Sequence, residues 1–218
     1  AGVRAIDGRA SLDLGDAALL GGRVSGRIAL NPQEREPGGE LQLSLTDVDL
    51  GALVGLSGMS GPLPHGRGSA EIELFADGRP RELDRADLTG TFALRFDQGS
   101  IAGFDRPTFE ELARGNAPFS LKEAAGGSFE FTAATVEGRI DHGLAELSRA
   151  SFEGTEKTLS VAGVIPYRSG NVAMAGSIQE RKGADSAAVG PAVNFLVGGT
   201  WPELVISPLK TLMETPAN

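Results

Sequence analysis

Residues 87–105 read DLTGTFALRFDQGSIAGFD, and the spacing of the apolar side chains in this stretch decides the fold class. Leu88, Phe92, Leu94 and Phe96 occupy even positions, with mainly polar residues at the odd positions between them. Because successive side chains of a strand point to opposite faces, this spacing predicts a strand with one apolar and one polar face. The sequence DQG at 97–99 predicts a tight turn, with its glycine at a positive φ, before a second, shorter strand.

The same alternation recurs in most other segments of the chain. Apolar residues that alternate with polar or small ones include Ile72, Leu74, Leu159, Val161, Val172 and Met174. Between 128 and 140 the apolar positions change from odd to even, which predicts either a β-bulge near Ala134 or a break between two strands. Residues 55–68 are rich in glycine and predict a loop that contains His65. Residues 179–190 are charged and then small, which favours disorder.

Two short helices are expected. Asp49 is placed to cap the first, which has one apolar side. Thr108 and Glu111 have the spacing of a capping box at the start of the second, and Gly115 ends it. The rest of the chain has no long helical pattern. The predicted fold class is therefore mainly β: a curved, mostly antiparallel sheet, as a β-groove or a partly open barrel, with two short α-helices.

Composition excludes several classes of function. The chain has 218 residues, a net charge of −9 and no cysteine. The acidic balance argues against nucleic acid, whose phosphates attract Lys and Arg, and against electrostatic docking on anionic lipid. The absence of cysteine excludes disulfides and thiolate metal sites. No apolar run approaches the roughly 18 residues of a membrane helix, and no signal peptide is visible. Because the chain begins within an alternating pattern, we expect it to be a fragment of a longer protein.

Few residues have the types and spacing that catalysis or metal binding requires. Asp141 beside His142 resembles the orienting pair of a hydrolase, but these residues also suit a turn, and His65 stands apart from them. Asp47 and Asp49 have a spacing found among metal ligands, but Asp49 also suits a helix cap. The motifs GxSxG, HExxH and GKS/T are absent from the sequence. We therefore predict no catalytic residue, no metal site and no cofactor, and a protein that is not an enzyme.

For three other residues we prefer a structural role over a functional one. Glu110 and Glu111 are explained by helix capping and by favourable placement near a helix N-terminus. Trp201 suits a core anchor of the last strand, with contact to a ligand as the alternative.

Six segments resemble the C-terminal domain of the AsmA family. In chain order they are LQLSLTDVDLGALVGLSG (41–58), LPHGRGSAEIEL (63–74), GTFALRFDQGSIAGFD (90–105), NAPFSLKEAAGGSFEFTAATVEGRI (116–140), KTLSVAGVIPYRSGNVAMAGSI (157–178) and FLVGGTWPELVISP (195–208). Each segment is short and rich in glycine, and their order along roughly residues 40–208 carries the resemblance. The chain departs from the family pattern at 165–167, where IPY replaces the usual Asp-Leu.

The resemblance implies a Gram-negative cell-envelope protein that is periplasmic and anchored in the inner membrane by one helix outside this chain. The family is linked to outer-membrane biogenesis and resembles bridge-like lipid-transfer proteins, whose curved sheets form an apolar groove. On this basis, residues 1–218 are one AsmA-like C-terminal β domain, with submodules 1–62 and 63–218 as a finer division. The implied function is lipid transport, with phospholipid passing between the inner and outer membranes.

The apolar face of the expected sheet leaves two interpretations open: a core between two packed sheets, or a groove for phospholipid acyl chains. Burial of about 16 methylenes at about 0.8 kcal/mol each gives on the order of 10 kcal/mol, so lipid binding needs no specific residue. We predict that the groove is lined by Leu88, Phe92, Leu94, Phe96, Ile72, Leu74, Leu159, Val161, Val172 and Met174. The alternative function is a scaffold that binds other envelope proteins through edge strands or through segments 41–62 and 105–127, without lipid.

Overall fold

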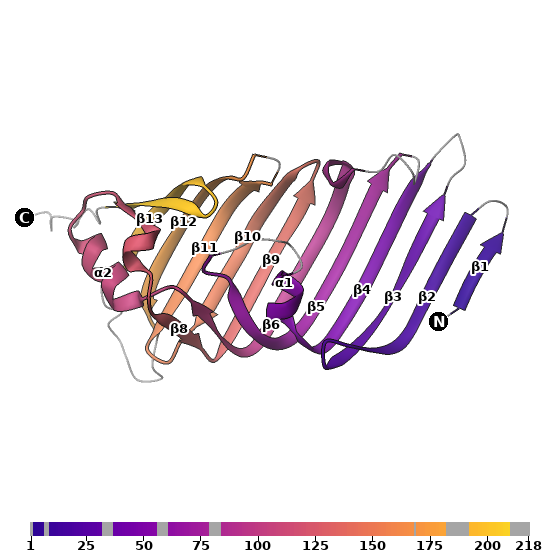
Figure 1. The fold of residues 1–218 in the computed structure, drawn as a ribbon, viewed down its shortest axis with the longest axis horizontal. Helices are drawn as coiled ribbons and strands as arrows, with labels where there is room; N and C mark the ends of the chain where they lie inside the picture. The colour runs from indigo at the N-terminus through magenta and orange to yellow at the C-terminus, as the bar shows by residue number, and fades with distance from the viewer. Residues whose placement is uncertain are drawn as a thin grey trace, which may run out of the picture.

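The computed structural model describes residues 2–6, 9–31, 37–55, 61–78, 84–167, 169–181 and 192–209. Its strands are β1 (Gly2–Ile6), β2 (Arg9–Leu19), β3 (Gly22–Asn31), β4 (Gly38–Asp49), β5 (Pro64–Asp77), β6 (Leu88–Ala102), β7 (Phe119–Ser120), β8 (Ser128–Phe131), β9 (Ala133–Asp141), β10 (Leu144–Glu153), β11 (Lys157–Pro166), β12 (Asn171–Glu180), β13 (Val193–Thr200) and β14 (Glu203–Leu209). They form one antiparallel sheet in the order β1-β2-β3-β4-β5-β6-β9-β10-β11-β12-β13-β14-β7, with β8 also paired to β6 (Figure 1). The sheet is curved and is not closed into a barrel, so the predicted fold class is confirmed.

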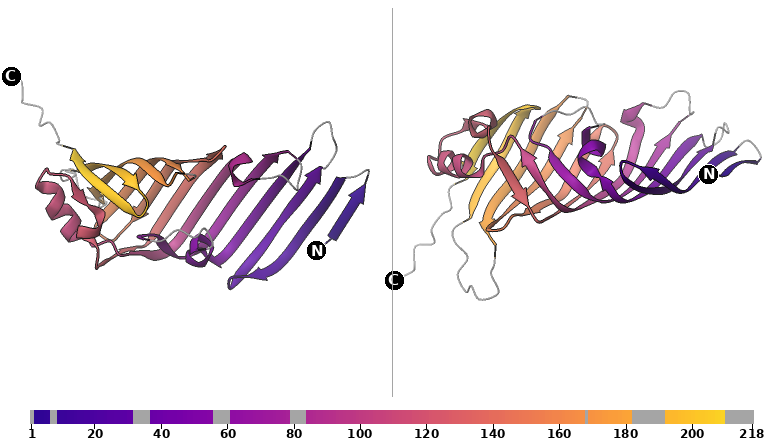
Figure 2. Two further views of the ribbon diagram at one scale, coloured as in Figure 1. Left: turned by 45° about the horizontal axis from the view of Figure 1, so that its top comes forward. Right: turned by 60° about the horizontal axis from the view of Figure 1, so that its bottom comes forward.

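The two short α-helices lie on the same side of this sheet (Figure 2). α1 (Leu50–Gly55) follows β4 and packs against β5, whereas α2 (Arg106–Arg114) packs against β13 and β14. The 3-10 helix η1 (Arg85–Asp87) precedes β6, and η2 (Leu121–Ala124) follows β7. Most strands pair with their neighbours in sequence, and the chain between β6 and β9 supplies the cover at the C-terminal end of the sheet. β4 pairs with β5, so one sheet extends to both sides of the boundary at residues 62 and 63 between the two predicted submodules.

Strand register brings the apolar side chains of neighbouring strands onto one face. Phe92 of β6 lies between Ile72 of β5 and Gly138 of β9, and Gly138 in turn pairs with Leu147 of β10. A second row consists of Leu94, Val136, Ala150 and Val161. We call this face of the sheet the inner face and the opposite face the outer face.

β6 is one continuous strand, so the predicted turn at 97–99 is wrong. Asp97 is an extra residue relative to β5 and forms a β-bulge, and β5 pairs with β6 on both sides of it. Because the neighbouring strand continues, pairing resumes at Gln98 directly after the unpaired Asp97, and the chain does not turn. Gly99 lacks the expected positive φ. It is required for close packing instead, since a Cβ atom there would lie 2.0 Å from the carbonyl oxygen of His65.

The predicted loop at 55–68 is wrong in its second part. β5 begins at Pro64, so His65 lies in a strand. Cβ atoms at Gly66 and Gly68 would lie 2.3 and 1.9 Å from carbonyl oxygens of β6. These glycines therefore permit close strand pairing, and they do not form a loop.

The change of the apolar positions from odd to even after residue 128 reflects a break between two strands. β8 ends at Phe131 and β9 begins at Ala133. Between them, the N–H of Thr132 donates a hydrogen bond to the carbonyl oxygen of Glu153 at 2.7 Å. Of the two predicted alternatives, the break is thus confirmed and the bulge near Ala134 is not.

Two other predicted segments fall partly on residues outside the described ranges. These are 56–60 of the predicted loop and 182–190 of the segment expected to be disordered. The first two residues of that second segment, 179 and 180, belong to β12.

The observed N-cap residue matches the prediction for α1 and differs from it for α2. Oδ1 of Asp49 accepts a hydrogen bond from the N–H of Ala52 at 3.0 Å, so the predicted cap of α1 is confirmed. In α2 the cap is Asp105, whose Oδ2 accepts from the N–H of Thr108 at 3.1 Å, so the capping role predicted for Thr108 is wrong. Asp105 has the extended backbone of an N-cap, and Pro107 has no N–H to satisfy. The glycine after α2 ends the helix as predicted.

We predict that Gly68→Ala destabilises the sheet far more than Gly15→Ala. A Cβ atom at Gly68 would lie 1.9 Å from the carbonyl oxygen of Arg95, whereas a Cβ atom at Gly15 meets nothing within 4 Å. Both glycines lie at β-bulges, so the variants differ mainly in this contact. In urea denaturation, Gly68→Ala should lower the free energy of unfolding by about 2 kcal/mol or more, and Gly15→Ala by less than about 0.5 kcal/mol. Equal losses in the two variants would contradict the packing argument.

Candidate functional site

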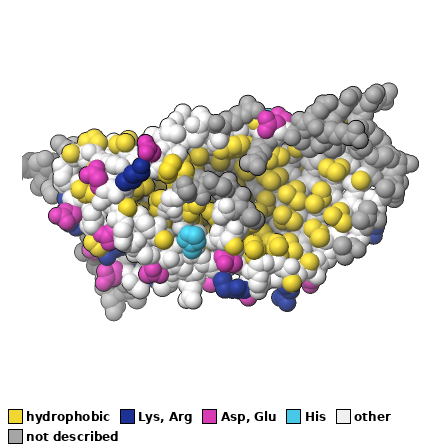
Figure 3. Space-filling model, viewed as in Figure 1, with side chains coloured by type: hydrophobic (Ala, Val, Ile, Leu, Met, Phe, Trp, Pro, Cys, Tyr) yellow, Lys and Arg dark blue, Asp and Glu magenta, His cyan; other side chains and the backbone are white. Residues whose placement is uncertain are grey.

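The inner face of β2, β3 and β4 is an apolar surface. Most of its side chains are half-buried or exposed, whereas Val24, Leu45 and Val48 on the same face are buried. The half-buried or exposed ones include Leu12, Leu14, Ile28, Leu30, Leu41 and Leu43. Within the described part of the chain these three strands form a single layer, and hydrophobic side chains gather on this part of the molecule in the space-filling view (Figure 3). An apolar surface of this kind is typical of a binding surface.

Towards the C-terminal end of the sheet, the inner face continues into a cavity of about 440 Å³. Strands β6 and β9–β14 form its floor, and the cover includes Val54 of α1, Leu63, Phe109 of α2 and Leu121 of η2. The lining residues that the structure describes are all apolar. Its volume lies within the range of about 300–1,000 Å³ that is usual for small-molecule sites.

Phe109 closes this cavity at the α2 end. Its ring is buried, with centroids 5.2, 5.4 and 4.9 Å from those of Phe104, Phe119 and Phe195. Tilted and edge-to-face pairs of this kind contribute about 0.5–1.5 kcal/mol each beyond their buried area. The aromatic contacts therefore fix α2 against the sheet and block the hollow there.

The ten residues predicted to line the groove all lie on the inner face. Five of them line the cavity: Phe92, Leu94, Leu159, Val161 and Met174.

The other five lie on the inner face beyond the cavity lining. Phe96 and Val172 are buried, and the ring of Phe96 packs edge-on against that of Phe131. Ile72, Leu74 and Leu88 are half-buried. In the described chain the inner face is thus a packed core in one part and an open surface in another.

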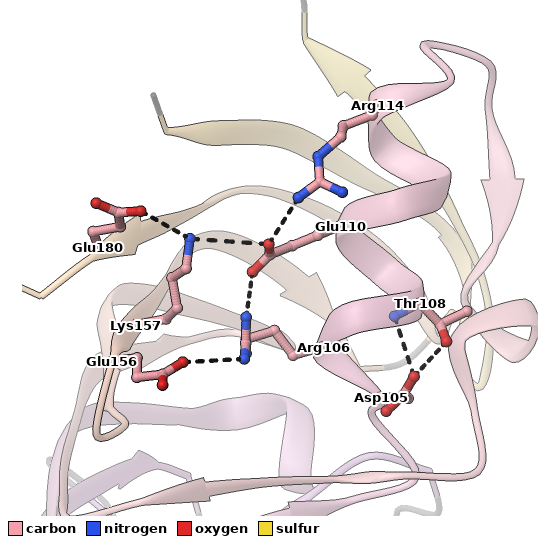
Figure 4. Close-up of polar contacts among 8 residues, drawn as sticks. All are labelled: Asp105, Arg106, Thr108, Glu110, Arg114, Glu156, Lys157 and Glu180. Atoms are coloured by element: carbon pink, nitrogen blue, oxygen red, sulfur yellow. Dashed lines mark hydrogen bonds and ion pairs between the residues drawn. The ribbon is translucent and has the colours of Figure 1, made fainter. Parts of the chain in front are cut away.

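A cluster of ion pairs holds α2 against β11 (Figure 4). Glu110 is only 5% exposed, and its carboxylate accepts from Nη1 of Arg106 at 2.9 Å and from Nη2 of Arg114 at 3.3 Å. Nζ of Lys157 on β11 lies 3.9 Å from the same carboxylate and 3.7 Å from Glu180 of β12. Because burial of an unpaired carboxylate is costly, these cations make the position of Glu110 tenable.

Sequence reasoning missed this cluster and assigned Glu110 only to capping and the helix dipole. One signal was present, since Arg106, Glu110 and Arg114 are spaced by four residues and so share a helix face. Lys157 carries no such signal, because it reaches the cluster only through the pairing of the sheet.

Asp47 and Asp49 have separate partners and do not act as a pair. Nε of Arg67 donates to Oδ1 of Asp47 at 2.9 Å, and this hydrogen bond is the main cause that lowers the pKa of Asp47 from its usual value. Asp49 caps α1. The described residues contain no group of three or more His, Asp or Glu side chains placed to hold a metal ion.

His142 and Gly143 form the two-residue hairpin turn between β9 and β10, and Asp141 is the last residue of β9. Nδ1 of His142 lies 2.6 Å from Oδ1 of Asp141, but both side chains are 62% exposed. His142 and Gly143 have φ values of 44° and 90°, as the primed turns of tight hairpins require. The interpretation as a turn residue is therefore confirmed for His142, whereas Asp141 pairs with Leu144 at the end of the strand. Neither His142 nor His65 belongs to the lining of the cavity.

Comparison with family models, with curated proteins and with solved structures gives no match for this chain. The resemblance to the AsmA family is thus carried by the quoted segments alone. Among the described helices, none is long and apolar enough to span a membrane.

We predict that Glu110→Gln weakens the attachment of α2 to the sheet. The change leaves three cations around a neutral amide, so it should lower the free energy of unfolding by about 2 kcal/mol or more. Glu111→Gln is the matched control, because Glu111 is exposed on the same helix, and it should cost less than about 0.5 kcal/mol. Guanidinium or urea denaturation of the three proteins measures both. A Glu110→Gln protein as stable as the control would contradict a stabilising role for the cluster.

Proposed function

We propose that the chain is a non-enzymatic module that holds lipid acyl chains along the inner face of its sheet. The observation that carries the proposal is a cavity whose described lining is apolar, joined by strand register to the largely single-layered face of β2–β4. Phe92, in the cavity lining, pairs with Ile72, and Ile72 pairs with Leu43 on β4. One apolar surface therefore runs from the single-layered strands into the cavity.

This lining suits a hydrocarbon tail and not a polar ligand. Among the described residues no charged side chain lines the cavity, so a sugar, nucleotide or peptide would lose hydrogen bonds to water without replacement. A methylene gains about 0.8 kcal/mol on leaving water, whichever apolar side chain it touches. The same property explains why no catalytic constellation is needed for this role.

We further propose that the parent protein is an AsmA-like periplasmic protein anchored in the inner membrane, and that it passes phospholipid between inner and outer membranes. The order of the family-like segments along the chain supports this assignment. The open, one-faced sheet supports it as well, because a conduit needs a surface along which acyl chains can slide. The net charge of −9 favours transfer by burial of the tails and disfavours adsorption to anionic lipid surfaces.

A second candidate function, a scaffold for envelope proteins, has one observation in its favour. Leu196, Val205 and Leu209 lie on the outer face of β13 and β14 and are each 45% exposed. Leu196 also pairs with the exposed Ala175 of β12. Apolar side chains that gather on a surface mark a protein contact more often than isolated ones do.

A photocrosslinker tests the scaffold function. Placed at Leu196 in a Gram-negative host, it should trap one partner protein of reproducible mass, whereas the same group at the exposed Thr91 on the outer face should trap none. Equal trapping at the two positions, or none at either, would exclude the scaffold function at this patch.

The lipid function predicts that filling the cavity displaces lipid. Val136 and Val161 both line it, and Val136→Phe with Val161→Phe adds bulk without adding charge. In native mass spectrometry after mild extraction from a Gram-negative host, the wild type should carry phospholipid. The double variant should carry at least about fivefold less, because each ring removes volume that an acyl chain needs.

The matched control is Thr135→Phe with Ala162→Phe. These residues are the direct neighbours of the two valines and point to the outer face. Lipid occupancy should equal that of the wild type. Absence of lipid from the wild type, or equal loss in both double variants, would count against the groove.

A further inference from the structure

Three neighbouring rows of side chains on the outer face of β11–β14 are free of charge. Strand register carries the rows that contain Leu196, Val205 and Leu209 across all four strands, and their other members are Ala, Val, Ser, Asn or Gly. Each of the three named side chains is 45% exposed. Elsewhere the outer face has charged side chains, such as Glu73 of β5 and Arg139 of β9. Because the core of a protein interface is depleted of charge, the three rows have the composition of a contact surface.

The sizes of these side chains make the surface complementary to itself. Leu196 and Val205 project from β13 and β14, whereas Ala173 and Ala175 of β12 are small and also exposed. A two-fold axis parallel to the strands, midway between β12 and β13, places Leu196 of one copy over Ala175 of a second copy and repeats this contact with the roles exchanged. Facing layers interdigitate when large residues of one layer meet small residues of the other. A two-fold interface requires this self-complementarity.

The surface is large enough for a specific contact. β11 and β12 have ten residues each, β13 has eight and β14 has seven. Strands lie about 4.8 Å apart and rise about 3.4 Å per residue, so four strands of this length present a face of roughly 500 Å². Two such faces bury roughly 1,000 Å² in total, which is the lower limit for a specific interface and fits a reversible dimer.

We propose that the outer face of β11–β14 binds the same face of a second copy of this chain, with the strands of the two sheets aligned about 10 Å apart. The inner faces, which the lipid function uses, then point away from each other on opposite sides of the dimer. The inference therefore goes beyond the lipid function and does not depend on it. It uses the patch of the second candidate function and names a copy of the chain as its occupant.

Charge favours a second copy over a bilayer as the occupant. Lys, Arg, Trp and Tyr anchor proteins at bilayer surfaces, and none of them stands in the three rows. The chain has a net charge of −9, so two copies repel each other at long range. An uncharged face is the one through which they associate at the lowest electrostatic cost. Added salt screens the repulsion and should therefore strengthen the dimer.

Sedimentation velocity of the purified chain measures the association. The wild type should pass from monomer to dimer between about 2 and about 200 μM. Its dissociation constant should fall at least about twofold when salt rises from about 0.05 to about 0.5 M. Leu196→Glu should weaken the dimer at least about tenfold, because it buries a carboxylate without a partner. Thr91→Glu is the matched control, since it adds the same charge at an exposed site on the outer face of β6, and it should change the dissociation constant less than about twofold.

Chemical crosslinking tests the two-fold arrangement and needs no disruptive variant. Ala162 of β11 and Ser207 of β14 lie in the row of Leu196, and the axis places each over the other residue of the second copy. The chain has no cysteine, so Ala162→Cys and Ser207→Cys proteins carry one thiol each. Packed sheets are too far apart for a disulfide, so a short bismaleimide is the probe. It should link the mixture of the two proteins, and neither protein to itself, because like positions are about 14 Å further apart along the sheet.

The outcomes separate this inference from both candidate functions. A chain that stays monomeric at about 200 μM at either salt concentration would overturn the dimer, whatever its lipid content. A dimer that Thr91→Glu weakens as much as Leu196→Glu, or one in which Ala162→Cys links to itself as readily as to Ser207→Cys, would contradict the proposed face. If the purified chain is monomeric and a photocrosslinker at Leu196 traps a different protein in the host, the scaffold function stands and the second copy is wrong. Leu196→Glu should carry as much phospholipid as the wild type, because the two faces are separate.

Discussion

The rest of this structure depends on one constraint: neighbouring strands must turn their apolar side chains to the same face of the sheet. A strand that slips by one residue turns all of its apolar side chains to the other face, so every strand must stay in step with the next. The sheet meets this constraint with β-bulges in β2, β4, β6 and β10. Each bulge adds one residue where the apolar positions of the sequence change from odd to even or back. The inner face thereby stays apolar across strands whose patterns are individually irregular.

The sequence predicts those features of the sheet that depend on local alternation of apolar and polar residues. The pattern around Phe92 and Leu94 is sufficient for the fold class, because a period of two fits only a strand. It does not predict the bulge at Asp97, since DQG has the same composition whether it turns the chain or bulges within a ladder. The difference lies in β5, which continues alongside. The cluster at Glu110 and the position of the Trp201 indole likewise depend on partners far away in the sequence.

The two ends of the inner face differ in what covers their apolar side chains. At the α2 end, Phe109 and the ion pairs of Glu110 hold a helix over the sheet, and the side chains beneath form a core. Over most of β2–β4 the described chain supplies no second layer, and only Val24, Leu45 and Val48 are buried there. A protein that needs stability and also a surface for hydrocarbon is expected to divide its sheet in this way, because one uniform cover would close the groove and no cover would leave the sheet without a core.

The meander order of the strands bears on how such a protein changes length. Because most strands pair only with their neighbours in sequence, duplication or loss of one hairpin leaves every other pairing intact. Each hairpin widens the sheet by two strand spacings, about 9–10 Å. Evolution can therefore match the span of this surface to a gap of any width by repeating a single unit, with no redesign of the end that α2 seals.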